Sequence, residues 1–586
     1  MPSPEAGLPS PDPGTRQATL RRAFDALHAG HFEAAWHAAG GSSGLDAADL
    51  EASLLAGLAL GGHSARVGAD GAAAPAAPGV EGASARELAE RSAAVLSAVA
   101  AMRPQHAHPC LDLLGLLRRQ RLQNGYAPVL HACLARAPDD PRLRRALAEL
   151  QHDDGDDAGA LDTIAAWLAL RPGDEAALGL RGTVLVSLGR AEAALAQFRA
   201  LAARSPGTAR HWTNLGNTLR LLGHLDEAVP ALRRAAELAP RDGQMRLNHA
   251  VALLHAGRLD AGWREYEARL SLPGHTALPH ARLLPALAAL PGGPAALRGR
   301  RVLCTHEEGF GDTLQFARFL PMLAAAGAHV VAQAPAPLVR LLRSLGPGIE
   351  VIEDGAAPPA WDWHCPMLSL PRVFGTTLDT IPSATPYLHA HPAAILAAEA
   401  RLMRGLGAGR ALRVGLAWAG QSRPWQPGFA AIDRRRSIGL AALAPLGALP
   451  GVALVGLQFG PEAAQAGTVA GLALHDGVAD ARDFADTAAV VACLDVIVSV
   501  DTAMVHLAGA LGRPVLMLDR FDACWRWLHG REDSPWYPGL RIVRQERPGD
   551  WGGVVGRVVE MLRDMAAARE QGRPEALPLD SAQGSP

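Results

Sequence analysis

The stretch that decides the fold of the second half of this chain reads Arg301-Val-Leu-Cys-Thr-His-Glu-Glu-Gly-Phe-Gly-Asp-Thr-Leu-Gln-Phe-Ala-Arg-Phe-Leu-Pro321. It predicts a short buried strand, a turn that contains Gly309 and Gly311, and a helix that begins at Asp312 or Thr313. A helix N-terminus after a glycine turn leaves backbone N–H groups unpaired and carries the positive end of the helix dipole. The stretch therefore predicts a site for a polar ligand, with the Asp312 carboxylate at its mouth.

Around that stretch, short apolar strands alternate with helical segments, a pattern that is typical of parallel doubly wound sheets. We predict a first series of strands at 301–305, 328–334, 349–353 and 363–370, and a second at 413–418, 452–458, 495–500, 514–518 and 540–544. A break near 390–410 separates them. We therefore expect two Rossmann-like domains, 275–395 and 396–570, that face each other and hold ligands at the carboxyl ends of their strands.

Upstream of these domains, the sequence repeats with a period of 34 residues. A unit of two helices, with a glycine between them and a proline after the second, is the signature of tetratricopeptide repeats. We expect an α-solenoid of such repeats over 91–274, whose concave face binds a polypeptide partner. The alternatives are that the array only supports the following domains or makes an oligomer contact. The residues in phase are Gly155, Gly189, Gly223 and Gly257, with Pro138, Pro172, Pro206 and Pro240.

The remaining segments are assigned from composition. We expect disorder over 1–15, helix pairs over 16–60, a flexible linker rich in Gly, Ala, Ser and Pro over 61–90, and a disordered tail over 571–586. The first residues lack the features of a signal peptide, and no apolar run is long enough to span a membrane. These observations favour a cytoplasmic protein with no membrane span.

Charge and residue usage exclude further classes. A formal net charge of −2 gives no support to nucleic-acid binding driven by bulk charge. The six cysteines are widely spaced, which argues against a disulfide framework and a structural zinc site, so no metal site is predicted. The chain contains no lysine, so cationic roles fall to arginine or to backbone N–H groups.

A second strand, turn and helix lie over Asp495-Val-Ile-Val-Ser-Val-Asp-Thr-Ala-Met-Val-His-Leu-Ala-Gly-Ala-Leu-Gly512. The N–H groups of Thr502 and Ala503 at the helix start suit a diphosphate. Asp501 would oppose a phosphate, so it is expected to cap the helix or to hold a neighbouring loop. His506, one turn further in, either reaches the ligand or packs within the helix layer.

The loop over 418–437, after the first strand of the second series, is rich in arginine. Small residues that follow Trp418, such as Gly420, allow a ligand to approach the backbone closely. Arg423 and Arg436 could then clamp the phosphates of a donor. The alternative is a solvated basic loop.

Two further features belong to the second domain. Gln458 ends the next predicted strand and could face a nucleotide base or ribose. An aromatic cluster follows, formed by Trp525-Arg-Trp527, Trp536-Tyr537 and Trp551. These rings could stack on a sugar or base, or they could pack the C-terminal segment between the domains.

In the first domain, three carboxylates compete for the role of a base. We favour Asp312 over Glu307 and Glu308 because the start of a helix fixes its direction, whereas a loop glutamate is less constrained. The alternative for Asp312 is an ordinary helix cap. Glu308 and Gln315, with the turn glycines Gly309 and Gly311, complete the predicted acceptor-side loop.

The stretch from Gly309 to Pro321, together with the stretch from Val500 to Gly512, resembles the ADP-heptose:lipopolysaccharide heptosyltransferase family. More closely, the chain is similar to bacterial tetratricopeptide proteins with a heptosyltransferase-like (glycosyltransferase family 9-like) C-terminal domain. The segments Cys365-Pro-Met-Leu-Ser-Leu-Pro, Phe374-Gly-Thr-Thr-Leu-Asp-Thr-Ile-Pro382 and Asp533-Ser-Pro-Trp-Tyr-Pro538 look like signatures of that subgroup. The resemblance covers about 295–565 for the transferase and 107–274 for the repeats.

This resemblance implies a GT-B fold and a metal-independent, inverting glycosyltransferase that needs no cofactor besides its nucleotide-sugar co-substrate. The family's catalytic aspartate matches Asp312, and its donor-phosphate helix matches Asp501, Thr502, Ala503 and His506. The family uses a lysine in the loop after the first C-domain strand. This chain has none, so the arginines of 418–437 are the expected substitute, and the donor need not be ADP-heptose.

A repeat array fused to a GT-B domain also resembles O-GlcNAc transferase and the tetratricopeptide glycosyltransferases that act on bacterial flagellins and autotransporters. We therefore expect transfer of a sugar from a nucleotide-sugar to a flagellin-like or surface-protein-like acceptor that the repeats recruit. One alternative is a protein-binding scaffold that has lost catalysis. Another is a transferase for a lipopolysaccharide-type saccharide, which predicts a basic or amphipathic membrane-facing surface.

Overall fold

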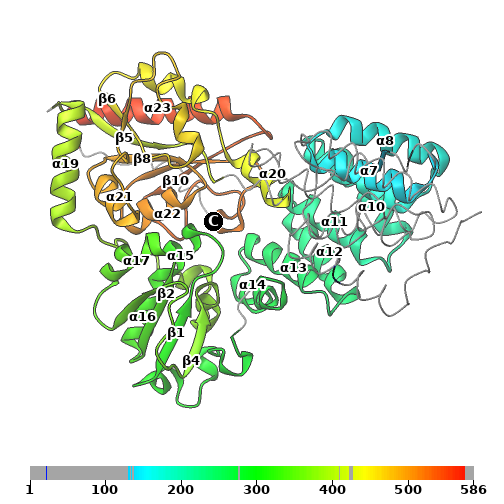
Figure 1. Cartoon of the computed structure of the whole chain (residues 1–586), viewed down its shortest axis with the longest axis horizontal. Helices are drawn as coiled ribbons and strands as arrows, with labels where there is room; N and C mark the ends of the chain where they lie inside the picture. The colour runs from blue at the N-terminus through cyan, green and yellow to red at the C-terminus, as the bar shows by residue number, and fades with distance from the viewer. Residues whose placement is uncertain are drawn as a thin grey trace, which may run out of the picture. The chain divides into compact units, whose positions relative to one another are not determined.

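The structure is a computed structural model (Figure 1) and describes residues 137–274, 278–407, 409–421 and 427–573, with Arg22, Leu130, His131 and Leu134. The predictions for 1–15, 16–60 and 61–90, most of the predicted tail, and Arg423 lie outside the described residues. The chain divides into two compact units, Met1–Arg190 and Ala191–Pro586.

The helices of the repeat array alternate with tight turns, as the 34-residue period predicts. Each in-phase glycine lies between two helices with a positive φ, between 71° and 85°, a conformation that a Cβ disfavours. The tetratricopeptide prediction is confirmed for the helices that the structure describes, while its part over 91–136 lies, apart from Leu130, His131 and Leu134, outside the described residues. In chain order the helices are α7 (Pro141–Asp153), α8 (Asp157–Leu170), α9 (Glu175–Ser187), α10 (Ala191–Arg204), α11 (Ala209–Leu221), α12 (Leu225–Leu238), α13 (Gly243–His255) and α14 (Leu259–Tyr266). In the first unit, α7, α8 and α9 share a core that includes Ile164, Trp167 and Val184.

The first α/β domain contains a four-stranded parallel sheet in the order β3-β2-β1-β4. Strand β1 is central and buried at four of its five positions, as expected for a strand with both faces covered. Strand β4 is shorter than predicted because a 3-10 helix begins at Met367. The elements are β1 (Arg301–Thr305), α15 (Phe310–Phe316), α16 (Leu320–Ala325), β2 (His329–Ala334), α17 (Ala336–Leu342), β3 (Ile349–Glu353), β4 (Trp363–Pro366) and α18 (Leu370–Val373).

The second α/β domain contains a six-stranded parallel sheet in the order β10-β9-β8-β5-β6-β7. The sequence did not predict β7, because this short strand carries no apolar run and is only half-buried. The elements are α19 (Pro392–Leu406), β5 (Leu412–Ala417), α20 (Pro427–Arg436), β6 (Val452–Gly456), β7 (Leu474–Asp476), α21 (Phe484–Val491), β8 (Val496–Val500), α22 (Ala503–Ala510), β9 (Val515–Asp519), β10 (Leu540–Arg544) and α23 (Trp551–Glu570). Helix α19 occupies the predicted break between the domains.

The last repeat and the two sheets share one hydrophobic core. Trp263 of α14 meets Phe316, Trp525 and Trp536 edge-on, with ring centroids 6.2, 5.3 and 6.4 Å apart. Leu254 of α13 belongs to the same cluster, which continues through β1 into α22. Trp525 and Trp536 are therefore packing residues, the second of the two roles considered for the aromatic cluster. Residue 274 ends the repeats but does not mark a boundary in the packing.

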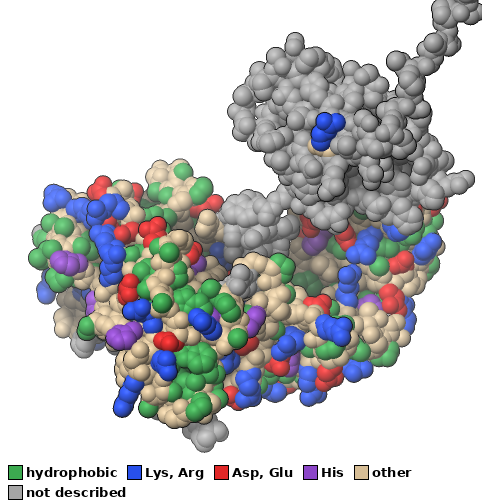
Figure 2. All heavy atoms as spheres, turned by 60° about the horizontal axis from the view of Figure 1, so that its bottom comes forward, with side chains coloured by type: hydrophobic (Ala, Val, Ile, Leu, Met, Phe, Trp, Pro, Cys, Tyr) green, Lys and Arg blue, Asp and Glu red, His purple; other side chains and the backbone are tan. Residues whose placement is uncertain are grey.

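The surface and the helices give two further observations. On the face that Figure 2 shows, arginine and acidic side chains of the described residues are interspersed. None of the helices in the described ranges combines the length and the apolar character that a membrane crossing requires.

Candidate active site

The turn between β1 and α15 fixes the direction of Asp312. Helix α15 begins at Phe310, earlier than predicted, so Asp312 is its third residue and Gly309 is its cap. The Asp312 Oδ2 atom accepts a hydrogen bond from the Gly309 N–H at 3.0 Å. Glu308, just before the cap, has a φ of 58°, which is uncommon for a residue with a Cβ. The turn thereby holds the carboxylate against its own backbone.

The other oxygen of Asp312 is bound by an arginine from the second domain. Arg526, in the 3-10 helix Trp525–Trp527, donates through Nη2 to Asp312 Oδ1 and through Nε to Gln315 Oε1 at 3.0 Å. Its guanidinium lies 4.3 Å from the centre of the Trp525 ring. Burial would lower the pKa of Arg526, but Asp312 outweighs it, so the pKa is raised above its usual value. Arg526 of the second domain thus binds both Asp312 and Gln315, two residues predicted for the first-domain side of the site.

Glu307 has a different partner, which the repeat array supplies. Arg269 follows α14 and donates to Glu307 through Nε at 3.2 Å and through Nη2 at 2.8 Å. Both side chains are buried, at 1% and 3% exposure. The Arg269 Nη2 also donates to Ser369 Oγ at 2.8 Å. A carboxylate held in this way anchors the loop, which leaves Asp312 and Glu308 as the carboxylates to compare for the base role.

The starts of α15 and α22 meet at Gly311. A Cβ on Gly311 would lie 2.7 Å from the His506 Cδ2 atom and 3.5 Å from the Ala503 Cα atom. Only glycine allows this approach without a shift in the neighbouring helix. Thr502 caps α22, since its Oγ1 accepts from the Met504 N–H at 3.2 Å. The structure therefore brings the two predicted helix starts together.

His506 packs within the helix layer, which is one of its two predicted roles. Its Nδ1 lies 3.0 Å from the Tyr537 hydroxyl, and its ring stacks on Trp527 with centroids 5.3 Å apart. Burial holds the pKa of His506 well below its usual value, so the imidazole is neutral. Contact with the donor stays a prediction for this residue.

The side chains of Gln458 and Trp418 are both buried within the second domain. The Gln458 Oε1 accepts from the backbone N–H groups of Trp418 and Ala419, each at 2.9 Å. Its Nε2 donates to the carbonyls of Ala419 and Phe459. The Trp418 ring is buried in the core. Backbone groups bind both ends of the Gln458 amide, and its contact with a base or ribose stays a prediction.

Arg436 connects the loop after β5 to the start of α22. Its guanidinium covers Gly420, where a Cβ would lie 2.5 Å from Nη2. Its Nη1 donates to the Asp501 carbonyl at 3.4 Å, and its Nη2 pairs with Asp433 at 2.8 Å. Asp501 therefore contacts the neighbouring loop through its carbonyl, while Thr502 caps the helix. Of the predicted phosphate ligands in this loop, Arg436 lies beside the helix start.

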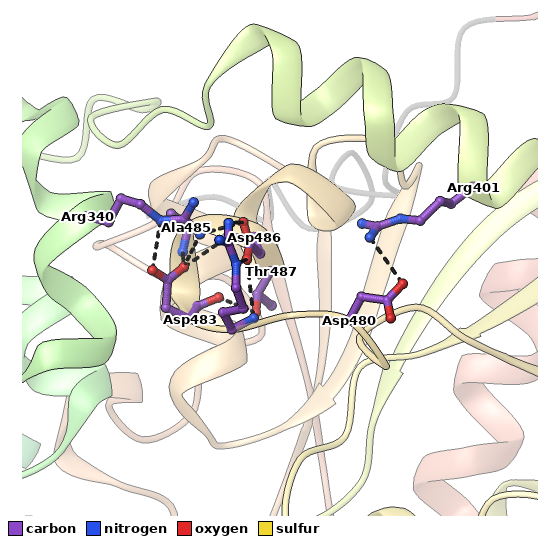
Figure 3. Close-up of polar contacts among 8 residues, drawn as sticks. Arg340, Arg401, Asp480, Asp483, Ala485, Asp486 and Thr487 are labelled. Carbon is purple, nitrogen blue, oxygen red and sulfur yellow. Dashed lines mark hydrogen bonds and ion pairs between the residues drawn. The ribbon is translucent and has the colours of Figure 1, made fainter.

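A separate ion pair ties the two domains together. Arg340 of α17 donates through Nε to Asp483 at 2.8 Å and through Nη2 to both Asp483 and Asp486 of α21 (Figure 3). Asp483 is also the cap of α21. In the same view, Arg401 of α19 reaches Asp480 at 3.5 Å. The Arg401–Asp480 pair lies within the second domain, so the contacts of α17 add to those of α15 in holding the two domains together.

Two sequence families match parts of this chain. The tetratricopeptide repeat family matches residues 127–175, 180–242 and 218–270. Glycosyltransferase family 9 (heptosyltransferase) matches residues 457–519, which run from the end of β6 through α22 to the end of β9. The chain thus carries tetratricopeptide repeats followed by a C-terminal glycosyltransferase family 9 domain.

Individual proteins resemble longer parts of the chain. Protein FlbA of Caulobacter vibrioides is 29% identical over 508 residues, which are 80% of this chain and 81% of FlbA. The solved glycosyltransferase family 9 structure from Veillonella parvula DSM 2008 aligns with 46% of this chain and 98% of its own, at 12% identity and a TM-score of 0.35. MamA (41-end) from Desulfovibrio magneticus RS-1 aligns with 28% and 92%, at 18% identity and a TM-score of 0.24.

Sequence reasoning missed the arginines that face the site from other elements. Arg526 lies within the Trp525-Arg-Trp527 segment that drew attention for its aromatic rings. A signal was present, since a lysine-free chain must use arginine for its cations and this one is flanked by stacking partners. Arg269 gave no comparable signal, because it reads as an ordinary surface residue at the end of a repeat.

Proposed function

We propose that this chain is an inverting, metal-independent glycosyltransferase that moves a sugar from a nucleotide-sugar donor to a protein acceptor, flagellin-like or surface-protein-like, recruited by the repeats in the cytoplasm. The observation that carries the proposal is the position of Asp312. It lies in the first turn of α15, is joined to Arg526 of the opposite domain, and stands one residue from the Gly311 contact with α22. The family 9 match over α22 supports the assignment of the donor side.

In the proposed reaction, Asp312 takes the proton of the acceptor hydroxyl while the hydroxyl oxygen attacks the anomeric carbon. The bond from that carbon to the donor phosphate oxygen breaks, and its electron pair leaves with the phosphate. The N–H groups at the start of α22 and the Arg436 guanidinium stabilise the negative charge that develops there. Because Asp312 already accepts from Gly309 and Arg526, the acceptor hydroxyl must use a remaining lone pair or displace Arg526.

The first prediction is that Asp312→Asn abolishes transfer while donor binding survives. Removing a general base lowers the rate by about 100-fold or more, but Asp312 is not among the groups proposed to hold the phosphates. We would measure nucleotide-sugar hydrolysis over a donor panel, and the intact mass of candidate surface proteins with and without the gene. Glu308→Gln is the matched control. Transfer that persists in Asp312→Asn but disappears in Glu308→Gln would assign the base to Glu308.

Hydrolysis by the wild-type chain also separates the enzyme from a scaffold that has lost catalysis. The joined Asp312 and Arg526 side chains favour the enzyme, because a lost activity would put no constraint on an ion pair between two domains. A chain that binds surface proteins but cleaves none of the nucleotide-sugars would contradict the proposal.

A further inference from the structure

Arginines from separate elements gather around Asp522, in the loop that follows β9. Arg435, near the end of α20, donates to Asp522 Oδ2 from Nε at 3.3 Å and from Nη2 at 3.1 Å. The Nε of Arg520 lies 3.5 Å from the other carboxylate oxygen. One carboxylate is thus shared between two guanidinium groups.

The repeat array brings a third arginine to this cluster. Arg220 lies on α11, whose following turn abuts the loop after β9, since a Cβ on Gly223 would lie 2.3 Å from the His529 Nε2 atom. Burial lowers the pKa of Arg220; Asp522 acts to raise it, and Arg520 and Arg435 act to lower it further. A repeat helix therefore places a cation beside the arginines of the transferase.

Several donors in this cluster are buried and find no acceptor among the described residues. They are Nε of Arg220, Nη1 of Arg520, and Nε of Arg436, the residue after Arg435. The Arg520 side chain is only 10% exposed. Buried guanidinium donors without acceptors are costly, so this arrangement favours an anion with several oxygens.

The arginines keep Asp522 in its charged form. Burial would raise the pKa of Asp522, but Arg520 and Arg435 outweigh it and hold the pKa below its usual value. The Asp522 carboxylate thus stays charged between Arg435 and Arg520, and the carboxylates of Asp501 and Asp519 also act on Arg520. The cluster also adjoins the start of α22, because Arg436, next to Arg435 in the chain, donates to the Asp501 carbonyl at 3.4 Å.

We propose that Arg220, Arg435 and Arg520 form an anion site for a phosphate group of the donor nucleotide, so that the repeat array itself supplies part of the donor site. This inference rests on the proposed function and deepens it. A phosphate offers several acceptor oxygens with the spacing that guanidinium groups bind in pairs. Asp522 holds the arginines in place before binding and competes with the phosphate for them.

The test measures binding of ADP, GDP, UDP, CDP, CMP and inorganic pyrophosphate to the full chain by titration calorimetry. We expect Arg220→Gln and Arg520→Gln each to weaken binding of the preferred nucleotide about tenfold or more, and to reduce its salt dependence. Arg210→Gln is the matched control, because Arg210 is exposed on the same helix α11. Asp522→Asn should tighten binding several-fold, a gain that misfolding cannot imitate.

Each result decides between the two proposals. If a nucleotide binds the wild type, but Arg220→Gln behaves like Arg210→Gln and Asp522→Asn binds no more tightly, the anion site is overturned and the proposed function stands. If pyrophosphate alone binds, with the expected dependence on the arginines, the site is supported and the nucleotide donor is overturned. Failure of every probe to bind the wild type would overturn both. If Arg220→Gln does not fold, Asp522→Asn decides.

Discussion

At the scale of single residues, Gly311 is the residue at which α15 of the first α/β domain contacts α22 of the second. Its missing side chain is what lets α15 approach Ala503 and His506. The sequence marks this glycine as part of a turn, but the structure places it inside a helix, where a glycine is normally unfavourable. Position 311 therefore requires glycine because of the contact between the domains, and not because of the backbone conformation of the turn.

We predict that Gly311→Ala destabilises the second unit by about 1–3 kcal/mol, the usual cost of forcing a methyl group into a packed contact. The matched control is Gly556→Ala in α23, where a Cβ would meet nothing within 4 Å. That change should be neutral or stabilising by up to about 1 kcal/mol, because alanine has the higher helix propensity. Urea unfolding of both variants measures the difference, and equal stability would contradict the role given to Gly311.

His255 makes the stability of the second unit depend on pH. Burial, with Arg220 next in effect, lowers the pKa of His255 to about 3, and neither ring nitrogen finds a partner among the described residues. In the unfolded chain the pKa is about 6.5, so below that pH the unfolded state binds a proton that the folded state does not. The contribution of His255 is complete above pH 6.5 and is lost as the pH falls towards 3.

We therefore predict that the free energy of unfolding falls between pH 6.5 and pH 4, with His255 contributing about 1.4 kcal/mol per pH unit well below 6.5. In His255→Leu, the free energy of unfolding should fall less steeply with decreasing pH, by the contribution of His255, since leucine does not titrate. Urea titrations at several pH values measure the slope. An unchanged slope in the variant would show that other groups carry the effect.

At the scale of elements, the loop between β1 and α15 is held from two sides. Arg269 of the repeat segment binds Glu307, and Arg526 of the second domain binds Asp312. The repeat segment thus anchors the loop at Glu307, while Asp312 at the start of α15 binds both Gly309 of the loop and Arg526 of the second domain. Its geometry depends on the repeats and on the donor-side domain together.

We predict that Arg269→Met destabilises the second unit by about 3–5 kcal/mol, because it leaves the buried Glu307 carboxylate without its arginine. The double variant Arg269→Met with Glu307→Leu should regain most of this loss, since no uncompensated charge then remains at the pair. The unfolding free energies of the single and double variants form the measurement. A double variant as unstable as the single one would show that the charge pair is not the cause.

Local patterns could predict most elements but not the pairs that build the site. The strand at 349–353 and the strand at 540–544 were predicted with their observed bounds, because apolar runs bounded by turns are local signals. The position of Asp312 near a helix start was predicted for the same reason. Its partner Arg526 lies 214 residues away in the chain, and no periodicity connects the two. The backbone partners of the Gln458 amide, which lie beside two strand ends, are likewise not indicated by any local pattern.

At the scale of the whole molecule, the last repeats are part of the transferase core. Trp263 and Leu254 share a cluster with β1 and α22, while the compact division of the chain falls at Arg190. The sequence period ends near 274, so it suggested a domain boundary there. A repeat period reports which residues form helix pairs, and says nothing about which face of a pair is covered by another domain.

We predict that a chain that begins at Ala191 folds cooperatively, whereas one that begins at residue 275 does not. The longer chain keeps Trp263 and the Arg269 anchor, and the shorter one exposes the apolar face on which they pack. Thermal unfolding and near-UV circular dichroism of the two purified chains provide the comparison. A sharp transition from the shorter chain would place the boundary where the period ends.

The shared core also has a consequence for how such proteins diversify. Recombination that exchanges helices before Ala191 leaves the cluster of Trp263, β1 and α22 with its own residues. A crossover within α11 to α14 would bring in foreign partners for Trp263, Arg269 and, on our proposal, Arg220. We therefore expect related chains to differ more in the repeats before Ala191 than in α11 to α14, whose residues pack on the α/β domains.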